Sequence, residues 1–386
     1  MTTSRREFMA AGAAAVAGLA LRSKPIQACV YGHTGRGGYG HGLDTCFNFH
    51  ENMKLLAVAD PDEKGRAAAM KRLGLATGYA SLQEMLDKEP AQLVSIGPRW
   101  AERKLEYISA CAKKGVSVYM EKPVAASLEE ADAIVDVADK AGIKIVAAHH
   151  VRLCPQVVHL KKLMDDGLIG QLLEIRTRGK EDQRAGGEDM MVLGTHCMYL
   201  MRFFGGEPLW CSARVTQDGR DITLADRRAA SEPLGPIAGD TIDAAFAFPK
   251  GVMGHFASHK VPKAEGGRFQ ITLHGSKGVA QFAIGQDPKV TYLLDPLWTQ
   301  GKAAEWKPLP DAPSNDDPSG AKSTDACNKR IVDELLRIRE SKGRSPVDIV
   351  EARATLEMIL SVYAAHLSAA RAAFPLKDRK HPLGTL

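Results

Sequence analysis

A strand-like run passes directly into a glycine-rich turn at residues 26–40, which read Ile26-Gln27-Ala28-Cys29-Val30-Tyr31 and then Gly32-His33-Thr34-Gly35-Arg36-Gly37-Gly38-Tyr39-Gly40. Glycines at such a turn let the backbone approach a pyrophosphate, and the amides at the start of a following helix can donate hydrogen bonds to it. The strict pattern G-x-G-x-x-G is not met, because Thr34 stands where the second glycine belongs. The turn favours a dinucleotide site, but it needs support from elsewhere in the chain.

That support comes from Asp60, which ends a second strand-like run and lies 23 residues beyond Gly37. A carboxylate at this place can accept both ribose hydroxyls of NAD, and it should repel the 2′-phosphate of NADP. The alternative is that Ala59-Asp60-Pro61-Asp62 is an ordinary turn or helix cap. Because strand, turn, helix and strand follow in the order that a dinucleotide-binding domain requires, the sequence predicts NAD as the cofactor, with NADP less favoured.

Short apolar strands alternate with amphipathic helices up to residue 150. Strands are expected at residues 26–31, 55–60, 93–96, 116–120 and 144–148, and helices at 63–73, 81–88, 101–114 and 128–141. Such alternation implies right-handed crossovers and a parallel sheet that is covered on both faces. Residues 25–150 are therefore predicted to form an α/β Rossmann domain.

After residue 150 the strand-like runs lie closer together, with turns but few helices between them. They cover residues 172–177, 241–248 and 269–274, while 217–239 and 308–323 are expected to be surface loops and 349–372 a long helix. This spacing is typical of an antiparallel sheet. Residues 151–386 are therefore predicted to form an α+β domain with a large, open-faced, mainly antiparallel sheet and a C-terminal helix.

The first 24 residues have the pattern of a targeting signal. Arg5 and Arg6 precede a small, apolar run that ends at Leu21, as in a twin-arginine export signal. The run is about 14 residues long, short of the roughly 18 to 20 needed to span a bilayer. The alternatives are a retained anchor and a disordered tail. The sequence predicts a protein that is exported to the periplasm or beyond, with no membrane span in its mature form.

Charge and cysteine content exclude several other classes of protein. The formal charge is +5, and residues 1–24 contribute +3 of it, from four basic residues and Glu7. The rest of the chain has only scattered basic pairs, so a nucleic-acid surface is not expected. The seven cysteines contain no Cys-x-x-Cys pair and their number is odd. This pattern argues against a zinc knuckle and a fully paired disulfide framework, and no metal site is predicted.

The clearest chemical motif is Met120-Glu121-Lys122-Pro123, which ends the strand expected at residues 116–120. Ligands bind at the carboxyl edge of open parallel sheets. A partly desolvated lysine beside a positively charged nicotinamide should have a lowered pKa, and it could then exchange a proton with a substrate hydroxyl. The alternative is a solvated lysine before a proline turn.

In these motifs the chain resembles the glucose-fructose oxidoreductase, inositol dehydrogenase and rhizopine-catabolism (Gfo/Idh/MocA) family. Besides the glycine turn and the motifs around Asp60 and Lys122, the resemblance rests on Ile96-Gly97-Pro98, residues 152–155, Gly167-Leu168-Ile169-Gly170, residues 186–206 and His274-Gly275-Ser276-Lys277-Gly278. It implies a Rossmann domain followed by an open-faced sheet domain, which supplies the substrate site and often the subunit interface. It also implies a sugar, glycoside or cyclitol substrate and a homo-oligomer.

The family's second catalytic element is a helix bearing Asp-x-x-x-His. Here His196 matches the histidine, but Val192 takes the place of the aspartate. Asp189 lies seven positions before His196, on roughly the same face of an expected continuous helix and about 10.5 Å away along its axis. We therefore expect Lys122, His196 and Asp189 to be catalytic.

The remaining site predictions divide between cofactor and substrate. Cofactor contacts are expected from Gly32, Thr34, Gly35, Arg36, Gly37, Asp60, Pro98, Glu121 and Lys122. Substrate contacts are expected from His150, Arg152, Glu188 and His196.

These residues predict an NAD-dependent oxidoreductase that acts on a secondary hydroxyl of a sugar, glycoside or polyol, with a tightly bound cofactor. Because Val192 replaces the aspartate, an alternative is a redox-neutral glycoside hydrolase, which oxidises its substrate transiently, eliminates the aglycone and returns the hydride. A third possibility is a binding protein without turnover, against which the retained Lys122 and His196 argue.

Overall fold

The computed structural model describes residues 24–261, 267–301, 304–341 and 343–385. The export signal predicted at residues 1–24 lies, except for Lys24, outside the described residues. No helix in the described part of the chain is long and apolar enough to cross a membrane.

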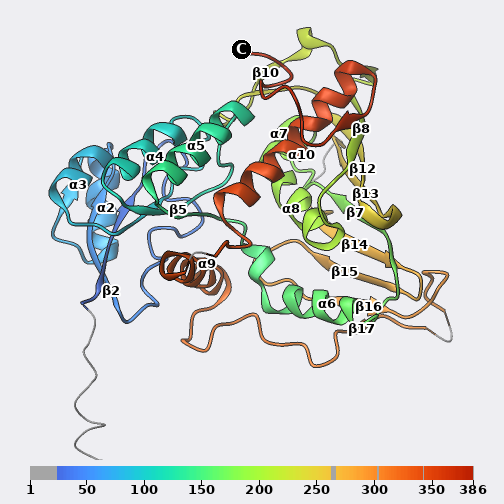
Figure 1. Ribbon diagram of the computed structural model, residues 1–386, viewed down its shortest axis with the longest axis horizontal. Coiled ribbons are helices and arrows are strands. Elements are labelled where there is room, and N and C mark those ends of the chain that lie inside the picture. The colour runs from blue at the N-terminus through green and yellow to red at the C-terminus, as the bar shows by residue number, and fades with distance from the viewer. Residues whose placement is uncertain (1–23, 262–266, 302–303, 342, 386) are drawn as a thin grey trace, which may run out of the picture.

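The first domain is built on a six-stranded sheet whose neighbouring strands are all parallel (Figure 1). Its strands, in the order β3-β2-β1-β4-β5-β6, are Gly78–Tyr79, Met53–Ala59, Ile26–Tyr31, Leu93–Ile96, Ser117–Met120 and Ile145–Ala147. Four helices follow the strands as predicted: α2 (Glu63–Leu73), α3 (Leu82–Lys88), α4 (Lys104–Lys113) and α5 (Leu128–Ala141). The predicted Rossmann architecture is confirmed.

The two faces of this sheet bury separate clusters. Cys29 and Tyr31 of β1 pack with residues of α3, α4 and α5, whereas Ala28 and Val30 point the opposite way, because side chains alternate along a strand. The second face is covered partly by a long helix, α9 (Ser323–Glu340), which the sequence analysis missed. This helix follows the second domain in sequence but packs against the first sheet.

The turn after β1 differs from the expected turn-then-helix arrangement. Residues 33–50 form turns, with no regular helix between β1 and β2. The reason is that Gly35, Gly37, Gly38, Gly40 and Gly42 all have φ between +59° and +84°. A right-handed helix requires negative φ, so the glycines that open the turn also prevent the helix.

The second domain contains a ten-stranded sheet that is antiparallel except where β7 pairs with β13. Its main path β17-β16-β15-β14-β7-β13-β12-β8-β18 runs through Lys307–Pro308, Thr291–Leu293, Val279–Ala283, Gln270–Gly275, Leu172–Arg178, Met253–His259, Thr241–Ala247, Trp210–Gln217 and Ala372–Ala373, and β9 (Arg220–Asp221) pairs with β8. The predicted, mainly antiparallel sheet is confirmed.

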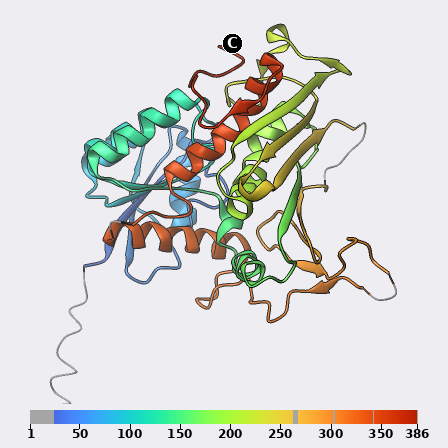
Figure 2. The same cartoon turned by 45° about the vertical axis from the view of Figure 1, so that its right-hand side comes forward.

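Helices cover one face of this sheet and leave the other open. Helices α8 (Gly194–Gly205) and α10 (Ile349–Ser368) lie between the second sheet and the first domain (Figure 2). The smaller elements are η1 (His150–Leu153), α6 (Pro155–Asp165), α7 (Gly187–Val192), η2 (Leu224–Asp226), η3 (Pro249–Gly251) and the strand pair β10 (Arg228–Ala229) and β11 (Pro236–Ile237). The segment 217–239, predicted to be a surface loop, is partly in the core, since Leu234 and Ile237 are buried.

Candidate active site

The carboxyl edge of the first sheet gathers the predicted cofactor residues under the glycine turn. Gly97 at the end of β4 packs so closely against the turn that an added Cβ would lie 2.8 Å from the Tyr39 Cα. A Cβ at Gly40 would collide with the side chain of Glu121, at the end of β5. The turn thus lies directly on the edge where dinucleotides bind in this architecture.

Asp60 holds this turn. Its carboxylate accepts hydrogen bonds from Thr34 Oγ1 at 2.7 Å, Thr34 N at 3.1 Å, Tyr39 Oη at 2.9 Å and Asp62 N at 3.0 Å, and the residue has no exposed surface. Asp62, and not Asp60, caps helix α2. Acceptance of ribose hydroxyls by Asp60 stays a prediction, because in this conformation its carboxylate oxygens already have partners.

The turn and its surroundings fit a dinucleotide in other respects. Within the described residues, the amides of Gly35 and Gly37 donate no hydrogen bond, as a pyrophosphate site requires. A cavity of about 440 Å³ opens beside the end of β2, lined by residues that include Tyr31, Pro61 and Tyr107. These residues can therefore hold NAD.

Two other predicted cofactor residues have partners within the protein. The Arg36 guanidinium pairs with Glu102 and lies 5.2 Å from the centre of the Trp100 ring. The carbonyl of Pro98 accepts a hydrogen bond from the buried Lys104 Nζ at 2.7 Å. In this structure both residues lie at the carboxyl edge of the first sheet, and their contact with a cofactor stays a prediction.

Lys122 sits in a buried position at the end of β5, with only 4% of its surface exposed. Its Nζ donates a hydrogen bond to the Val192 carbonyl at 2.9 Å. Burial disfavours the charged ammonium and lowers its pKa, while the nearby Glu121 carboxylate opposes this shift. The predicted acid/base lysine thus lies in the desolvated environment that its chemistry requires.

The helix expected over residues 186–196 is interrupted. Helix α7 ends at Val192, and α8 begins at Gly194, with Leu193 between them. The amide of His196 bonds to the carbonyl of Leu193 at 3.0 Å, and the Val192 carbonyl takes Lys122 as its partner. The position that lost the aspartate side chain still contacts the lysine, through its backbone.

A small cavity of about 100 Å³ joins the predicted chemical residues. Lys122, His150 and His196 line it together with His41, Val151, Phe269, Ile284, Gly285 and Gln286. The Nε2 atom of His150 lies 2.9 Å from Tyr119 Oη and 2.8 Å from Asn328 Oδ1, so the ring is held firmly. Burial lowers the pKa of His196 well below its usual value. Both histidines are thus kept neutral near pH 7 and can accept or donate hydrogen bonds to a hydroxyl.

Sequence reasoning missed His41 and Phe269 at this cavity. The ring of Phe269 lies 6.3 Å from that of His196 in an edge-on arrangement and forms an apolar wall. His41 stands between two glycines, Gly40 and Gly42, directly after the turn. A histidine placed between two glycines, directly after a turn that is expected to bind the cofactor, was the sequence signal that could have identified it.

Asp189 does not line this cavity, and its predicted catalytic role stays a prediction. Its carboxylate accepts hydrogen bonds from the amides of Lys180 at 3.1 Å and Glu181 at 3.0 Å, and from Ser258 Oγ at 2.7 Å. It has no exposed surface. The break at Leu193 separates it from His196, so the continuous helix that would have aligned the two side chains does not exist.

Two predicted substrate residues also lie elsewhere. The Glu188 carboxylate is bound by the amide and hydroxyl of Ser231. The Arg152 guanidinium lies 3.5 Å from the centre of the Phe203 ring, in a separate cavity of about 240 Å³. Neither residue lines the cavity that contains Lys122, and both substrate assignments stay predictions.

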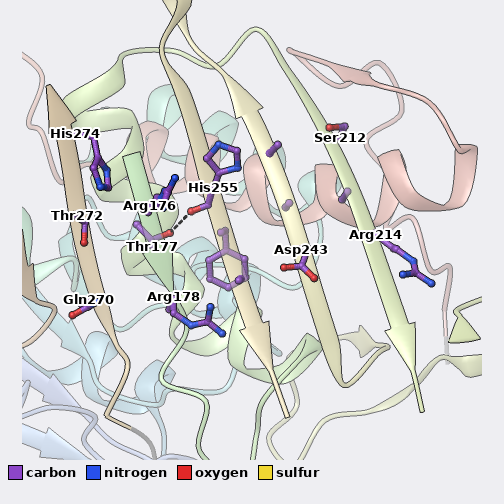
Figure 3. A pocket seen from close by; sticks show the side chains of 15 residues that line it. Arg176, Thr177, Arg178, Ser212, Arg214, Asp243, His255, Gln270, Thr272 and His274 are labelled. Atoms are coloured by element: carbon purple, nitrogen blue, oxygen red, sulfur yellow. Dashed lines mark hydrogen bonds between the residues drawn. The ribbon is translucent and has the colours of Figure 1, made fainter. Parts of the chain in front are cut away.

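Another cavity, of about 650 Å³, lies on the open face of the second sheet. Figure 3 shows outward-pointing polar side chains along its strands, among them Arg176, Arg178, His255 and Asp243. His255 and His259 lie near acidic partners, Glu174 at 3.3 Å and Asp243 at 2.9 Å. The homo-oligomer predicted from the family resemblance stays a prediction.

The comparisons with known proteins agree with this geometry. A family model described as "Oxidoreductase family, NAD-binding Rossmann fold" matches residues 27–149, and one described as "GFO/IDH/MocA C-terminal domain" matches residues 157–281. The chain belongs to the Gfo/Idh/MocA oxidoreductase family. It therefore carries the NAD-binding Rossmann domain of an oxidoreductase, as predicted.

Relatives in this family act on varied substrates. The levoglucosan dehydrogenase of Pseudarthrobacter phenanthrenivorans is 24% identical over 59% of this chain and 64% of its own length. The trans-1,2-dihydrobenzene-1,2-diol dehydrogenase of Bos taurus is 24% identical over 68% of this chain and 74% of its own. The 2,7-anhydro-N-acetylneuraminate hydratase of Escherichia coli is 29% identical over 38% of this chain and 39% of its own. The alignments with the first and third thus span less than two thirds of those relatives.

Solved structures share the whole fold. A levoglucosan dehydrogenase in complex with NADH and levoglucosan has a TM-score of 0.71 at 16% identity, covering 91% of this chain and 100% of its own. An NAD binding oxidoreductase from Klebsiella pneumoniae has a TM-score of 0.72 at 16% identity, covering 92% and 100%. At such low identity these likenesses confirm the two-domain architecture only.

The buried histidines make stability depend on pH. Burial lowers the pKa of His149 to about 3 and those of His150 and His381 to about 4, from 6.5. Below pH 6.5 the unfolded chain binds protons at these positions and the folded protein does not, so each histidine removes about 1.4 kcal/mol of stability per pH unit down to its folded pKa. We expect the unfolding midpoint in urea to fall between pH 7 and pH 4.5, and His381→Gln to make this fall shallower. A midpoint that is flat over this range would contradict the neutral, buried state.

Proposed function

We propose that this protein uses NAD to oxidise a secondary hydroxyl of a sugar, glycoside or polyol. The observation that carries the proposal is the cavity in which Lys122, His150 and His196 meet at the carboxyl edge of the Rossmann sheet. NAD, when bound along this edge, supplies the hydride acceptor. The dehydrogenases among the relatives support a sugar or polyol substrate.

Different residues of the chain bind the substrate and transfer the proton. Lys122 exchanges a proton with the reacting hydroxyl, because its ammonium is desolvated and its pKa is lowered by burial. The Val192 carbonyl keeps Nζ at the cavity wall until a hydroxyl takes its place. His196 and the firmly held His150 orient the substrate by hydrogen bonds, and Phe269 excludes water on one side.

The redox-neutral glycoside hydrolase is the second candidate. Loss of the aspartate at Val192 favours it, and so does the likeness to the 2,7-anhydro-N-acetylneuraminate hydratase. A closed redox cycle with a tightly held cofactor also suits an exported protein, which has no soluble NAD pool outside the cytoplasm.

Proton NMR in D₂O separates the two functions. The purified protein is incubated, without added cofactor, with levoglucosan, D-xylose, myo-inositol and methyl glucosides. A keto-sugar that forms only in stoichiometric amount until an electron acceptor is supplied identifies the dehydrogenase. Release of free sugar with deuterium next to the oxidised carbon identifies the hydrolase. If every compound stays unchanged with and without NAD and an acceptor, the proposed function is wrong.

We also propose that the protein is exported through the twin-arginine route, on the strength of Arg5-Arg6 and the short apolar run that follows. Export is tested by fractionating cells that express the protein and a variant with Arg5→Lys and Arg6→Lys. The unchanged protein should reach the periplasm and the variant should stay in the cytoplasm. Equal distribution of the two would contradict the signal.

The hydrogen bonds of Asp189 predict that its substitution lowers the stability of the protein and leaves its activity nearly unchanged. Asp189→Asn replaces one acceptor oxygen with an amide, which leaves one of three buried donors without a partner and should lower the free energy of unfolding by about 2 kcal/mol. Turnover of a sugar found by the NMR experiment should stay within about threefold of the unchanged protein. A loss of kcat with unchanged stability would instead support the predicted catalytic role of Asp189.

A further inference from the structure

One titratable side chain at the cavity has no part in the mechanism above. His41 lies on the turn over the Rossmann edge and lines the same cavity as Lys122. Its Nδ1 is 2.6 Å from Glu121 Oε1, and the same carboxylate oxygen accepts a hydrogen bond from the His41 amide at 2.7 Å. Backbone and ring are therefore both fixed by a single carboxylate.

The two partners differ sharply in exposure. Glu121 has no exposed side-chain surface, whereas 39% of the His41 side chain is exposed. Burial raises the pKa of Glu121, but the hydrogen bond and charge of His41, together with the charges of Lys122 and His150, outweigh burial and hold this pKa at about 2. A buried carboxylate that stays ionised can stabilise a positive charge on the imidazole beside it.

The second ring nitrogen of His41 is available for chemistry. Within the described residues Nε2 has no hydrogen-bond partner. Since Glu121 accepts a hydrogen bond from Nδ1–H, the neutral ring presents the lone pair of Nε2. The backbone of His41 is held as well, because Asn328 Nδ2 of α9 donates a hydrogen bond to the His41 carbonyl at 3.0 Å.

Lys122 needs a neighbouring group that can take up its proton and pass it to solvent. Oxidation of a hydroxyl releases one proton, and Lys122, which receives it, is 4% exposed. The titratable groups that face His41 are Glu121 and Lys122 at the end of β5, His150 on η1 and His196 on α8. Of these, His150 has only 6% of its surface exposed and is bonded to Tyr119 and Asn328. His196 is partly exposed, but His41, with 39% of its side chain exposed, reaches the solvent more fully and is also paired with Glu121.

We propose that His41 is the proton relay between the buried Lys122 and solvent. In the oxidation direction the sugar O–H bond breaks and its proton passes to Lys122. The proton then moves from the Lys122 ammonium to Nε2 of His41, directly or through a cavity water, so that one N–H bond breaks and another forms. The imidazolium, stabilised by Glu121, releases the proton to solvent. This inference rests on the proposed function and adds the exit path for the proton.

The kinetic test uses His41→Ala, with His255→Ala on the open sheet face as the matched control. The His41 variant should lose about 10- to 100-fold in kcat with KM within about twofold, as expected when a proton transfer is slowed. Added imidazole should restore much of the lost rate in a saturable manner. The control should match the unchanged protein, and Lys122→Ala should not respond to imidazole. An unaltered kcat, or a loss that imidazole does not repair, overturns the relay.

A second readout needs neither substrate nor turnover. Diethyl pyrocarbonate acylates exposed, neutral imidazole nitrogens, and peptide mapping by mass spectrometry locates the adducts. We expect His41 to be modified rapidly and His150, in the same cavity, to stay unmodified. Protection of His41 in the free protein overturns the relay whatever the activity. If the unchanged protein oxidises none of the sugars, the proposed function fails, whereas activity that survives in His41→Ala and is lost in Lys122→Ala rejects the relay alone.

Discussion

Replacement of Lys122 by alanine is expected to lower kcat at least about 1000-fold while NAD remains bound. The variant loses both the proton acceptor and a hydrogen-bond donor to the reacting oxygen, and general acid–base catalysis alone accounts for about 100- to 10,000-fold. In this structure the ammonium is bonded to the Val192 carbonyl, so nucleotide affinity should change less than about threefold. Steady-state kinetics on the sugar found by NMR and calorimetric titration with NAD measure the two effects.

The chain offers a matched control in Lys104, which is also fully buried at this edge of the sheet. Its Nζ donates to the carbonyls of Pro98 at 2.7 Å and Glu121 at 3.0 Å, and burial lowers its pKa to about 8. Lys104→Met should lower the thermal midpoint, since two carbonyls lose their donor, but it should retain most of kcat. Equal losses of kcat in both variants would mean that Lys122 acts through structure, and the chemical assignment would fail.

The parts of the site that follow from strand order could be predicted from sequence. Lys122 ends an apolar strand, and parallel strands present their carboxyl ends at one edge, so its position required no knowledge of side-chain packing. His196 was placed at the same site by the family's motif, and the cavity contains both residues. In each case one local pattern determined the location.

The predictions that differ from the structure are those in which one local sequence pattern is compatible with two different structures. The spacing from Asp189 to His196 predicts one helix face, but the break at Leu193 turns Asp189 toward the loop at residues 180–181. The glycines after β1 signal close backbone approach, yet their positive φ also removes the expected helix. Helix α9 was missed, although Ile331, Leu335 and Ile338 have helical spacing and all pack on the first sheet. Which sheet an amphipathic helix covers depends on long-range contacts that one sequence does not display.

Asp60 and Tyr39 lead to the second large effect, which concerns NAD affinity. If Asp60 binds the ribose, Asp60→Ala should weaken NAD about 100-fold, since hydrogen bonds to a charged group contribute about 1.5 to 3 kcal/mol each. It should also lower stability, because Thr34, Tyr39 and Asp62 lose their acceptor. Calorimetric titration with NAD, after removal of nucleotide that copurifies, measures the affinity, and urea unfolding measures the stability.

Tyr39→Phe distinguishes this role from a purely structural one. The Tyr39 hydroxyl competes for the Asp60 oxygen that a ribose hydroxyl would use, and its ring lies against Gly32. In the phenylalanine variant the ring still packs in the same place, but the Asp60 carboxylate oxygen is free to accept a ribose hydroxyl. NAD should therefore bind up to about tenfold more tightly, in line with about 1.4 kcal/mol for one hydrogen bond. The two substitutions should therefore move the affinity in opposite directions. Weaker NAD binding in both variants would show that Asp60 acts only by fixing the conformation of the glycine turn. In that case the Tyr39 hydroxyl would help binding, because its hydrogen bond to Asp60 keeps the turn in the conformation that binds NAD.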